Sequence, residues 1–229
     1  MNLSMTTAFV CMLTCAGLAG SAQTLAQECP ADTSGPASIT VAYDNGTGGS
    51  ATNSMNAVIF TPSNDGTLRA VDAHTGQSLW EFIAPELSRV SGGSSAGNAS
   101  GRMTDLRVLR FDANDDGVID ASSGDKLWLY FGLRRGGPFY YALDVSFRGP
   151  PQVLWKLGAS DLPGLGEAWS TPTIARVRIA GAAQNSEHFV LILGGGYDDT
   201  PGRSGNRIFM VDAASGRLRS ARSVARADD

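Results

Sequence analysis

The sequence predicts an all-β protein in the form of a partial β-propeller with roughly three quinoprotein-like blades. Short apolar segments recur along the chain between turns rich in glycine, which supplies 28 of the 229 residues. A motif of an apolar strand, an aspartate and a turn returns along the chain, and a hydrophobic content of 42% is enough for a core. Four-stranded sheets stacked around an axis bury both faces in this way, and a β-sandwich is the main alternative.

The N-terminus is expected to be an export signal, separate from the fold. Residues 6–20 form an uncharged apolar run that is too short for a stable membrane anchor and is followed by small residues. No lysine or arginine precedes this run, and a buried N-terminal segment is the alternative. We assign residues 1–26 to a signal peptide and 27–55 to a linker with one edge strand at 38–43. Cleavage would leave no transmembrane anchor.

Strand candidates fill the remaining region, 56–229, which we assign to the partial propeller. Each candidate is a short apolar or alternating segment that ends at a turn residue. The expected strands are 57–61, 68–72, 78–82, 106–111, 126–132, 139–144, 152–157, 171–177, 189–193, 207–212 and a segment from 217 onward. An aspartate-rich loop is inserted between the strands at 106–111 and 126–132.

A repeated motif supports the blade architecture. An apolar strand ends in Asp72, Asp144 and Asp212, at a spacing of about 70 residues, and each aspartate is expected to cap a tight turn through its carboxylate. Leu-Trp follows the first two copies, where Trp80 and Trp155 are expected to pack between neighbouring sheets. The spacing exceeds the usual blade repeat of about 40 to 45 residues because the segment 91–103 and the aspartate-rich loop are inserted between the first two copies.

The inserted loop has the composition of a calcium site. Oxygen donors occupy alternate positions, and Gly117 at position six permits the sharp turn that such loops need. The expected ligands are Asp112, Asn114, Asp116, the Val118 carbonyl, Asp120 and, as the weakest candidate, Asp125. Ser123 stands where a helix-loop-helix site has glutamate, and both flanks are predicted strands. The cofactor predicted is therefore Ca²⁺ in a strand-flanked loop, and a solvated turn is the alternative.

No pattern in the sequence indicates catalysis or nucleic-acid binding. The net charge of −4 and the absence of any basic cluster longer than Arg134-Arg135 argue against DNA or RNA as a partner. The sequence of the Gly-Ser-Ser-Ala-Gly segment at 93–97 matches the nucleophile-elbow pattern, but no strand and helix are predicted on either side of it. We therefore expect a protein that is not an enzyme.

Five segments together resemble the PilY/PilC family of type IV pilus biogenesis and tip-adhesin proteins: 64–80, 106–120, 133–145, 168–172 and 194–198. The resemblance implies a noncatalytic calcium-binding propeller that acts in pilus biogenesis and surface adhesion. It also implies an exported protein, in the periplasm, at the outer membrane surface or in a fimbrium. The implied partners are pilin or minor pilins, and a host or abiotic surface.

Two expectations follow from the length of the chain. Family members are usually longer, so the chain resembles a truncated or split member. An open set of about three blades exposes unpaired edges, which predicts a partner, self-association or marginal stability. The alternative function is a fragment of a periplasmic quinone-cofactor (PQQ-type) dehydrogenase, whose propeller also holds calcium but beside the cofactor in a complete ring.

Overall fold

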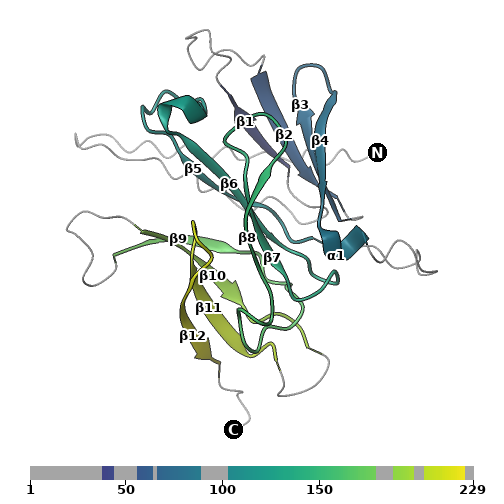
Figure 1. The fold of residues 1–229 in the computed structure, drawn as a ribbon, viewed down its shortest axis with the longest axis vertical. Helices are drawn as coiled ribbons and strands as arrows, with labels where there is room; N and C mark the ends of the chain where they lie inside the picture. Colours follow the sequence, from purple (N-terminus) through teal and green to yellow (C-terminus); the bar gives the residue numbers. More distant parts are fainter. Residues whose placement is uncertain are drawn as a thin grey trace, which may run out of the picture.

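A computed structural model describes residues 38–43, 56–63, 66–88, 103–178, 188–198 and 204–224 (Figure 1). These residues form three antiparallel sheets of four strands each, together with one short α-helix, α1 (Pro85–Ser88). The all-β class and the number of sheets agree with the prediction. None of the helices in these ranges is long and apolar enough to cross a membrane.

Within each sheet, strands that are consecutive in the chain are hydrogen-bonded neighbours. The first sheet contains β1 (Ile39–Ala42), β2 (Ala57–Pro62), β3 (Thr67–Asp72) and β4 (Ser78–Ile83). The second contains β5 (Arg107–Phe111), β6 (Lys126–Gly132), β7 (Tyr140–Asp144) and β8 (Gln152–Leu157). The third contains β9 (Thr173–Val177), β10 (His188–Gly194), β11 (Arg207–Asp212) and β12 (Leu218–Ser223).

The strand β1 lies at the edge of the first sheet, where it pairs antiparallel with β2. The sequence assigned this segment to a linker with an edge strand, and the structure makes it the fourth strand of the first blade. The expected signal peptide, 1–26, and the rest of the linker, 27–37 and 44–55, lie outside the described residues.

The second sheet lies between the other two and is buried on both faces (Figure 1). Successive residues of a strand point to opposite faces, so β6 divides its apolar side chains between two cores. Leu129 and Phe131 pack with residues of the first sheet. Tyr130 joins the second core, which contains Leu191 and Phe209 of the third sheet. Two stacked interfaces therefore hold the three sheets together.

The third strand of each sheet repeats the same local structure. The register shifts by a bulge between Ala70 and Val71, between Ala142 and Leu143, and between Met210 and Val211. The aspartate that ends each of these strands accepts hydrogen bonds from the turn that follows. Asp72 accepts from the Thr75 amide at 2.7 Å, and Asp212 accepts from the Ser215 amide at 2.9 Å. The predicted aspartate-capped turn is thus present.

Candidate metal site

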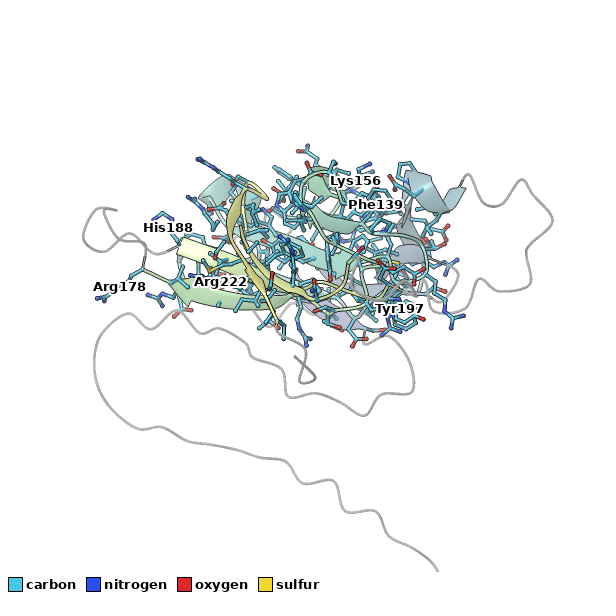
Figure 2. All side chains as sticks on the ribbon, turned by 90° about the horizontal axis from the view of Figure 1, so that it is seen from below. Phe139, Lys156, Arg178, His188, Tyr197 and Arg222 are labelled. Carbon is cyan, nitrogen blue, oxygen red and sulfur yellow. The ribbon has the colours of Figure 1, made fainter. Side chains whose placement is uncertain are left out.

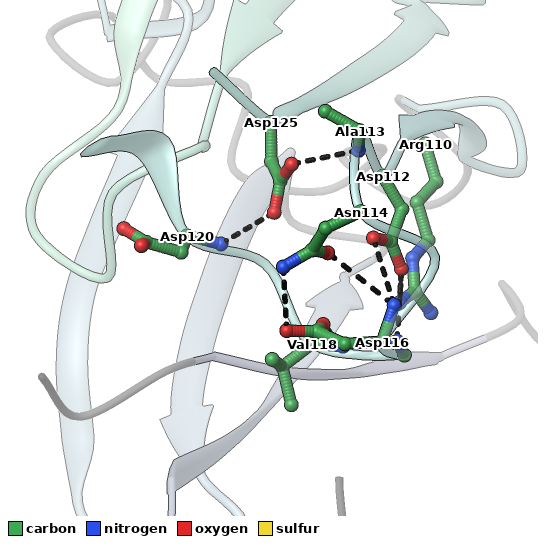
Figure 3. Close-up of polar contacts among 9 residues, drawn as sticks. Arg110, Asp112, Ala113, Asn114, Asp116, Val118, Asp120 and Asp125 are labelled. Atoms are coloured by element: carbon green, nitrogen blue, oxygen red, sulfur yellow. Dashed lines mark hydrogen bonds and ion pairs between the residues drawn. The ribbon is translucent and has the colours of Figure 1, made fainter. Parts of the chain in front are cut away.

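The aspartate-rich loop connects β5 to β6 at the end of the second sheet (Figure 3). Phe111 pairs with Lys126, so the loop connects two antiparallel strands of a hairpin. The sequence predicted a strand on each side of the loop, and both are present. Gly117 has φ +85°, which confirms the sharp turn expected at position six. Asp115 also takes a left-handed conformation, with φ +56°, which aspartate tolerates better than most residues.

Three of the predicted ligands lie together in the first half of the loop (Figure 3). The Asp112 carboxylate accepts hydrogen bonds from the Gly117 amide at 3.0 Å and from the Asp116 amide at 3.3 Å. The Asn114 side-chain nitrogen donates to an oxygen of Asp116 at 2.8 Å. The other Asp116 oxygen accepts from the Val118 amide at 2.9 Å. The loop is therefore folded around its own side-chain oxygens.

Asp125 fastens the two ends of the loop to each other. Its side chain is fully buried, and its two oxygens accept from the Ala113 amide at 2.8 Å and from the Asp120 amide at 2.9 Å. A buried carboxylate is costly unless it is hydrogen-bonded, and here both oxygens are satisfied by backbone amides. In this structure Asp125 closes the loop.

The Asp120 carboxylate turns away from the first half of the loop (Figure 3). It caps the 3₁₀ helix η4 (Ala121–Ser123) by accepting from the Ser122 amide at 2.8 Å. The hydroxyls of Ser122 and Ser123 also donate to it, at 2.7 Å each. The hydrogen bond from the Ser123 side chain is the largest cause that lowers the pKa of Asp120, followed by those from Ser122.

The structure therefore brings together Asp112, Asn114 and Asp116 but not the whole predicted ligand set. Throughout the described ranges, no three carboxylate, histidine or cysteine side chains are gathered so that they could hold a metal ion. The donor chemistry of the loop nevertheless suits a hard cation, because each candidate ligand offers oxygen. Calcium binding here remains a prediction.

The second half of the loop packs against the first sheet. Ile119 is buried, and its amide donates to the Ala42 carbonyl at 2.9 Å. Ile119 also forms a parallel bridge with Tyr43, whose hydroxyl donates to the Val145 carbonyl at 2.5 Å. The loop thus joins the edge of the first sheet to the second sheet.

Arg110 is a member of the site that the sequence analysis missed. Its guanidinium Nη2 donates to Asp112 at 2.7 Å, in an ion pair whose carboxylate side is largely buried. A signal was present in the sequence, because residues two apart in a strand lie on the same face. An arginine two residues before the first ligand is therefore placed to compete with a cation for that ligand.

Three stacked four-stranded sheets define a partial β-propeller, and the comparisons with known proteins agree. No protein-family model matches the chain. The fold is similar to the crystal structure of the Pseudomonas aeruginosa PilY1 C-terminal domain, with a TM-score of 0.53 and 23% identity. That match covers 76% of this chain and 32% of the other. The predicted propeller fold is confirmed.

Two curated proteins are similar in sequence. The type IV pilus biogenesis factor PilY1 of Pseudomonas aeruginosa is 27% identical over 164 residues, which are 70% of this chain and 13% of that protein. The PilY1 homolog of Xylella fastidiosa is 30% identical over 120 residues, which are 52% of this chain and 9% of that protein. The chain spans a small part of these relatives. With the structural match, they confirm the resemblance to the C-terminal region of PilY1 proteins.

Proposed function

We propose that the protein is a noncatalytic, calcium-binding β-propeller module that takes part in type IV pilus biogenesis and in surface adhesion. The observation that carries this proposal is the sequence similarity to two proteins named type IV pilus biogenesis factors, together with the matching fold. In this proposal the chain is exported to the periplasm, the outer membrane surface or a fimbrium. Its partners there are pilin or minor pilins, and a host or abiotic surface.

The structural roles of three carboxylates support a display function in place of turnover. Asp72 and Asp212 cap turns, and Asp125 closes a loop. Each of these carboxylates accepts hydrogen bonds from backbone amides, so it stabilises the local conformation of the chain. Sheets stiffened in this way present constant surfaces to a partner, which is the property that a binding module needs.

Calcium would act on the conformation of the loop. Asp112 and Asp116 both carry negative charge in the first half of the loop, and the Asn114 side-chain oxygen accepts from the Asp116 amide at 3.3 Å. A divalent cation that binds these groups would offset the repulsion between them and stabilise the folded loop. The Val118 carbonyl, Asp120 and Asp125 are the further donors in this proposal, and Asp120 would have to turn away from Ser122 and Ser123 to reach the ion. Because Ile119 is bonded to Ala42, the ion would also stabilise the contact between the first two sheets.

The pilus role is tested by cosedimentation with type IV pili sheared from the organism that encodes the chain. The purified full chain should pellet with the pili and should remain in the supernatant when the pili are left out. A chain that never pellets with pili, although it is folded by circular dichroism, would contradict the proposed role.

Calcium binding is tested separately by a thermal shift titration. The chain should melt at a higher temperature in calcium, and this shift should be lost in Asp112→Ala and Asp116→Ala. Asp115→Asn is the matched control, because it removes one charge from the same loop without removing a predicted ligand, and asparagine tolerates the left-handed backbone. An equal loss of the shift in all three variants would show a charge effect and no specific site.

A further inference from the structure

Three loops at one end of the second and third sheets are joined by backbone hydrogen bonds. They are the loop between β6 and β7, the loop between β8 and β9, and the segment after β10. The Arg134 amide donates to the Ala168 carbonyl at 3.1 Å. Glu167 and Tyr197 exchange two backbone bonds, at 2.7 and 2.9 Å. This pairing gives the three loops one common framework.

The framework carries a group of exposed and half-buried aromatic and charged side chains, which we call the Trp169 surface. It consists of Arg134, Arg135, Glu167, Trp169 and Tyr197. The guanidinium carbons of both arginines lie 5.7 Å from the centre of the Trp169 ring. The Tyr197 ring meets Trp169 edge-on at 6.3 Å, and the Trp169 indole donates to Glu167 at 2.8 Å. Trp169 is 37% exposed and Tyr197 56% exposed.

Arg134 and Arg135 differ from several other cations of the protein. Arg69, Arg148 and Arg219 each form an ion pair with a carboxylate. Within the described part of the chain, Arg134 and Arg135 contact the Trp169 ring and pair with no carboxylate. The Arg134 Nε is buried without a hydrogen-bond partner. Arg134 also has φ +41°, a left-handed conformation that is unfavourable for arginine and is enriched at functional sites.

A pocket of about 270 Å³ opens beside this surface. It is lined by Pro138, Leu165, Gly166, Glu167, Tyr197 and Asp198. One side of the pocket requires glycine, because a Cβ at Gly166 would come within 2.3 Å of the Tyr197 carbonyl oxygen. Close backbone approach between Gly166 and Tyr197 therefore shapes this side of the pocket.

We propose that the Trp169 surface and this pocket bind an acidic peptide segment of a partner protein. A carboxylate of the segment pairs with the guanidinium groups of Arg134 and Arg135, because charge-assisted hydrogen bonds from arginine to a carboxylate are stronger than neutral ones. Glu167 and Asp198 disfavour a second carboxylate in the pocket, so a neighbouring apolar side chain enters it and packs against Tyr197. Tryptophan, tyrosine and arginine are also the residues that contribute most to binding energy at protein interfaces.

This site is independent of the calcium loop, and its test does not rely on pili. The probe is a fluorescein-labelled peptide of alternating glutamate and leucine, and binding to the purified full chain is followed by fluorescence anisotropy. The reference peptide has glutamine in place of glutamate, and a single-stranded DNA oligonucleotide tests for general anion binding. We expect the acidic peptide to bind at least about tenfold more tightly than either reference, a difference of about 1.4 kcal/mol.

Two variants and one control locate the site. Arg135→Gln and Tyr197→Ala change exposed side chains, so the fold should persist, and each should weaken binding of the acidic peptide about tenfold. Arg222→Gln removes the same charge from an exposed position on β12, which Figure 2 shows far from Tyr197, and it should leave the affinity unchanged. No binding of the acidic peptide would overturn the proposal. Equal losses in Arg135→Gln and Arg222→Gln, or equal affinity for the oligonucleotide, would also overturn it.

Discussion

The indole nitrogen of Trp155 donates a hydrogen bond of 2.9 Å to the backbone carbonyl of Ala213. Trp155 lies on β8 of the second sheet, and Ala213 directly follows β11 of the third, so the bond crosses the interface between the two sheets. Tyr130 stacks on the indole at 5.8 Å, and its hydroxyl donates to the same carbonyl at 3.2 Å. The tryptophan of the repeated motif therefore holds two neighbouring blades together, as the sequence predicted.

Replacing Trp155 should destabilise the protein strongly. Trp155→Ala removes a large buried side chain and leaves the Ala213 carbonyl with one donor, so a loss of about 3 to 5 kcal/mol is expected. Tyr130→Phe is the control, because it removes only a hydroxyl from the same carbonyl and should cost about 0.5 to 1.5 kcal/mol. Urea unfolding followed by circular dichroism measures both values. A loss below that of Tyr130→Phe would show that Trp155 does not join the sheets.

Two glycines in equivalent turns separate backbone strain from packing. Gly76 and Gly216 have φ +71° and +69°, but a Cβ at Gly76 would meet nothing within 4 Å. A Cβ at Gly216 would lie 2.9 Å from the Trp155 ring. Gly76→Ala should therefore cost about 1 to 2 kcal/mol from the left-handed backbone alone. Gly216→Ala should cost clearly more in the same urea experiment, and equal losses would show that the ring moves aside freely.

Most strands could be predicted because each is a short apolar segment that ends at a turn residue. The prediction placed β8 at 152–157 and β11 at 207–212, and both have these bounds in the structure. The segment at 38–43 was harder to place, because alternation identifies a strand but not the sheet that it joins. The pairing of Ile39 with Phe60 is long-range and left no local signal.

The candidate sites were predictable only where their residues are close in the sequence. Spacing identified Asp112, Asn114 and Asp116, which lie together. Spacing could not show that Asp120 would turn toward Ser122, because the side-chain rotamer depends on local competition for hydrogen bonds. The Trp169 surface draws its residues from three loops that are far apart in the sequence, so only the folded sheets bring them into contact.

Acid should lower the free energy of unfolding in part through protonation of Asp72. Its pKa is lowered chiefly by the hydrogen bond from the Thr75 amide, with further contributions from the Thr75 hydroxyl, the His74 amide and the positive charge of Arg148. A carboxylate with a lowered pKa stabilises the fold above its unfolded pKa of about 3.9 and loses that effect as the pH falls through the folded value. The difference in unfolding free energy between the native protein and Asp72→Asn should therefore shrink below about pH 4. A difference that stays constant from neutral pH to pH 3 would contradict this account.

Ile119 should control whether the loop stays attached to the first sheet. Ile119→Ala removes a side chain that is 1% exposed, which should cost about 2 to 5 kcal/mol. The amide of residue 119 should also exchange its hydrogen faster, because the truncated side chain leaves the hydrogen bond to the Ala42 carbonyl more accessible to water. Val118→Ala, in the same loop, is the control and should leave this amide protected. Hydrogen exchange measured by NMR distinguishes the two.

Arg110 should oppose calcium binding in the loop, if calcium binds there as proposed. Its guanidinium already pairs with Asp112 at 2.7 Å, so an incoming cation must compete for that carboxylate and also experiences the positive charge. A partly exposed ion pair contributes about 0.2 to 1 kcal/mol, so Arg110→Gln should tighten calcium binding by up to about fivefold in calorimetry. Arg107→Gln removes the same charge from an exposed position at the start of β5 and should change the affinity less. A weaker affinity in Arg110→Gln would mean that the arginine orders Asp112 for the ion and does not compete with it.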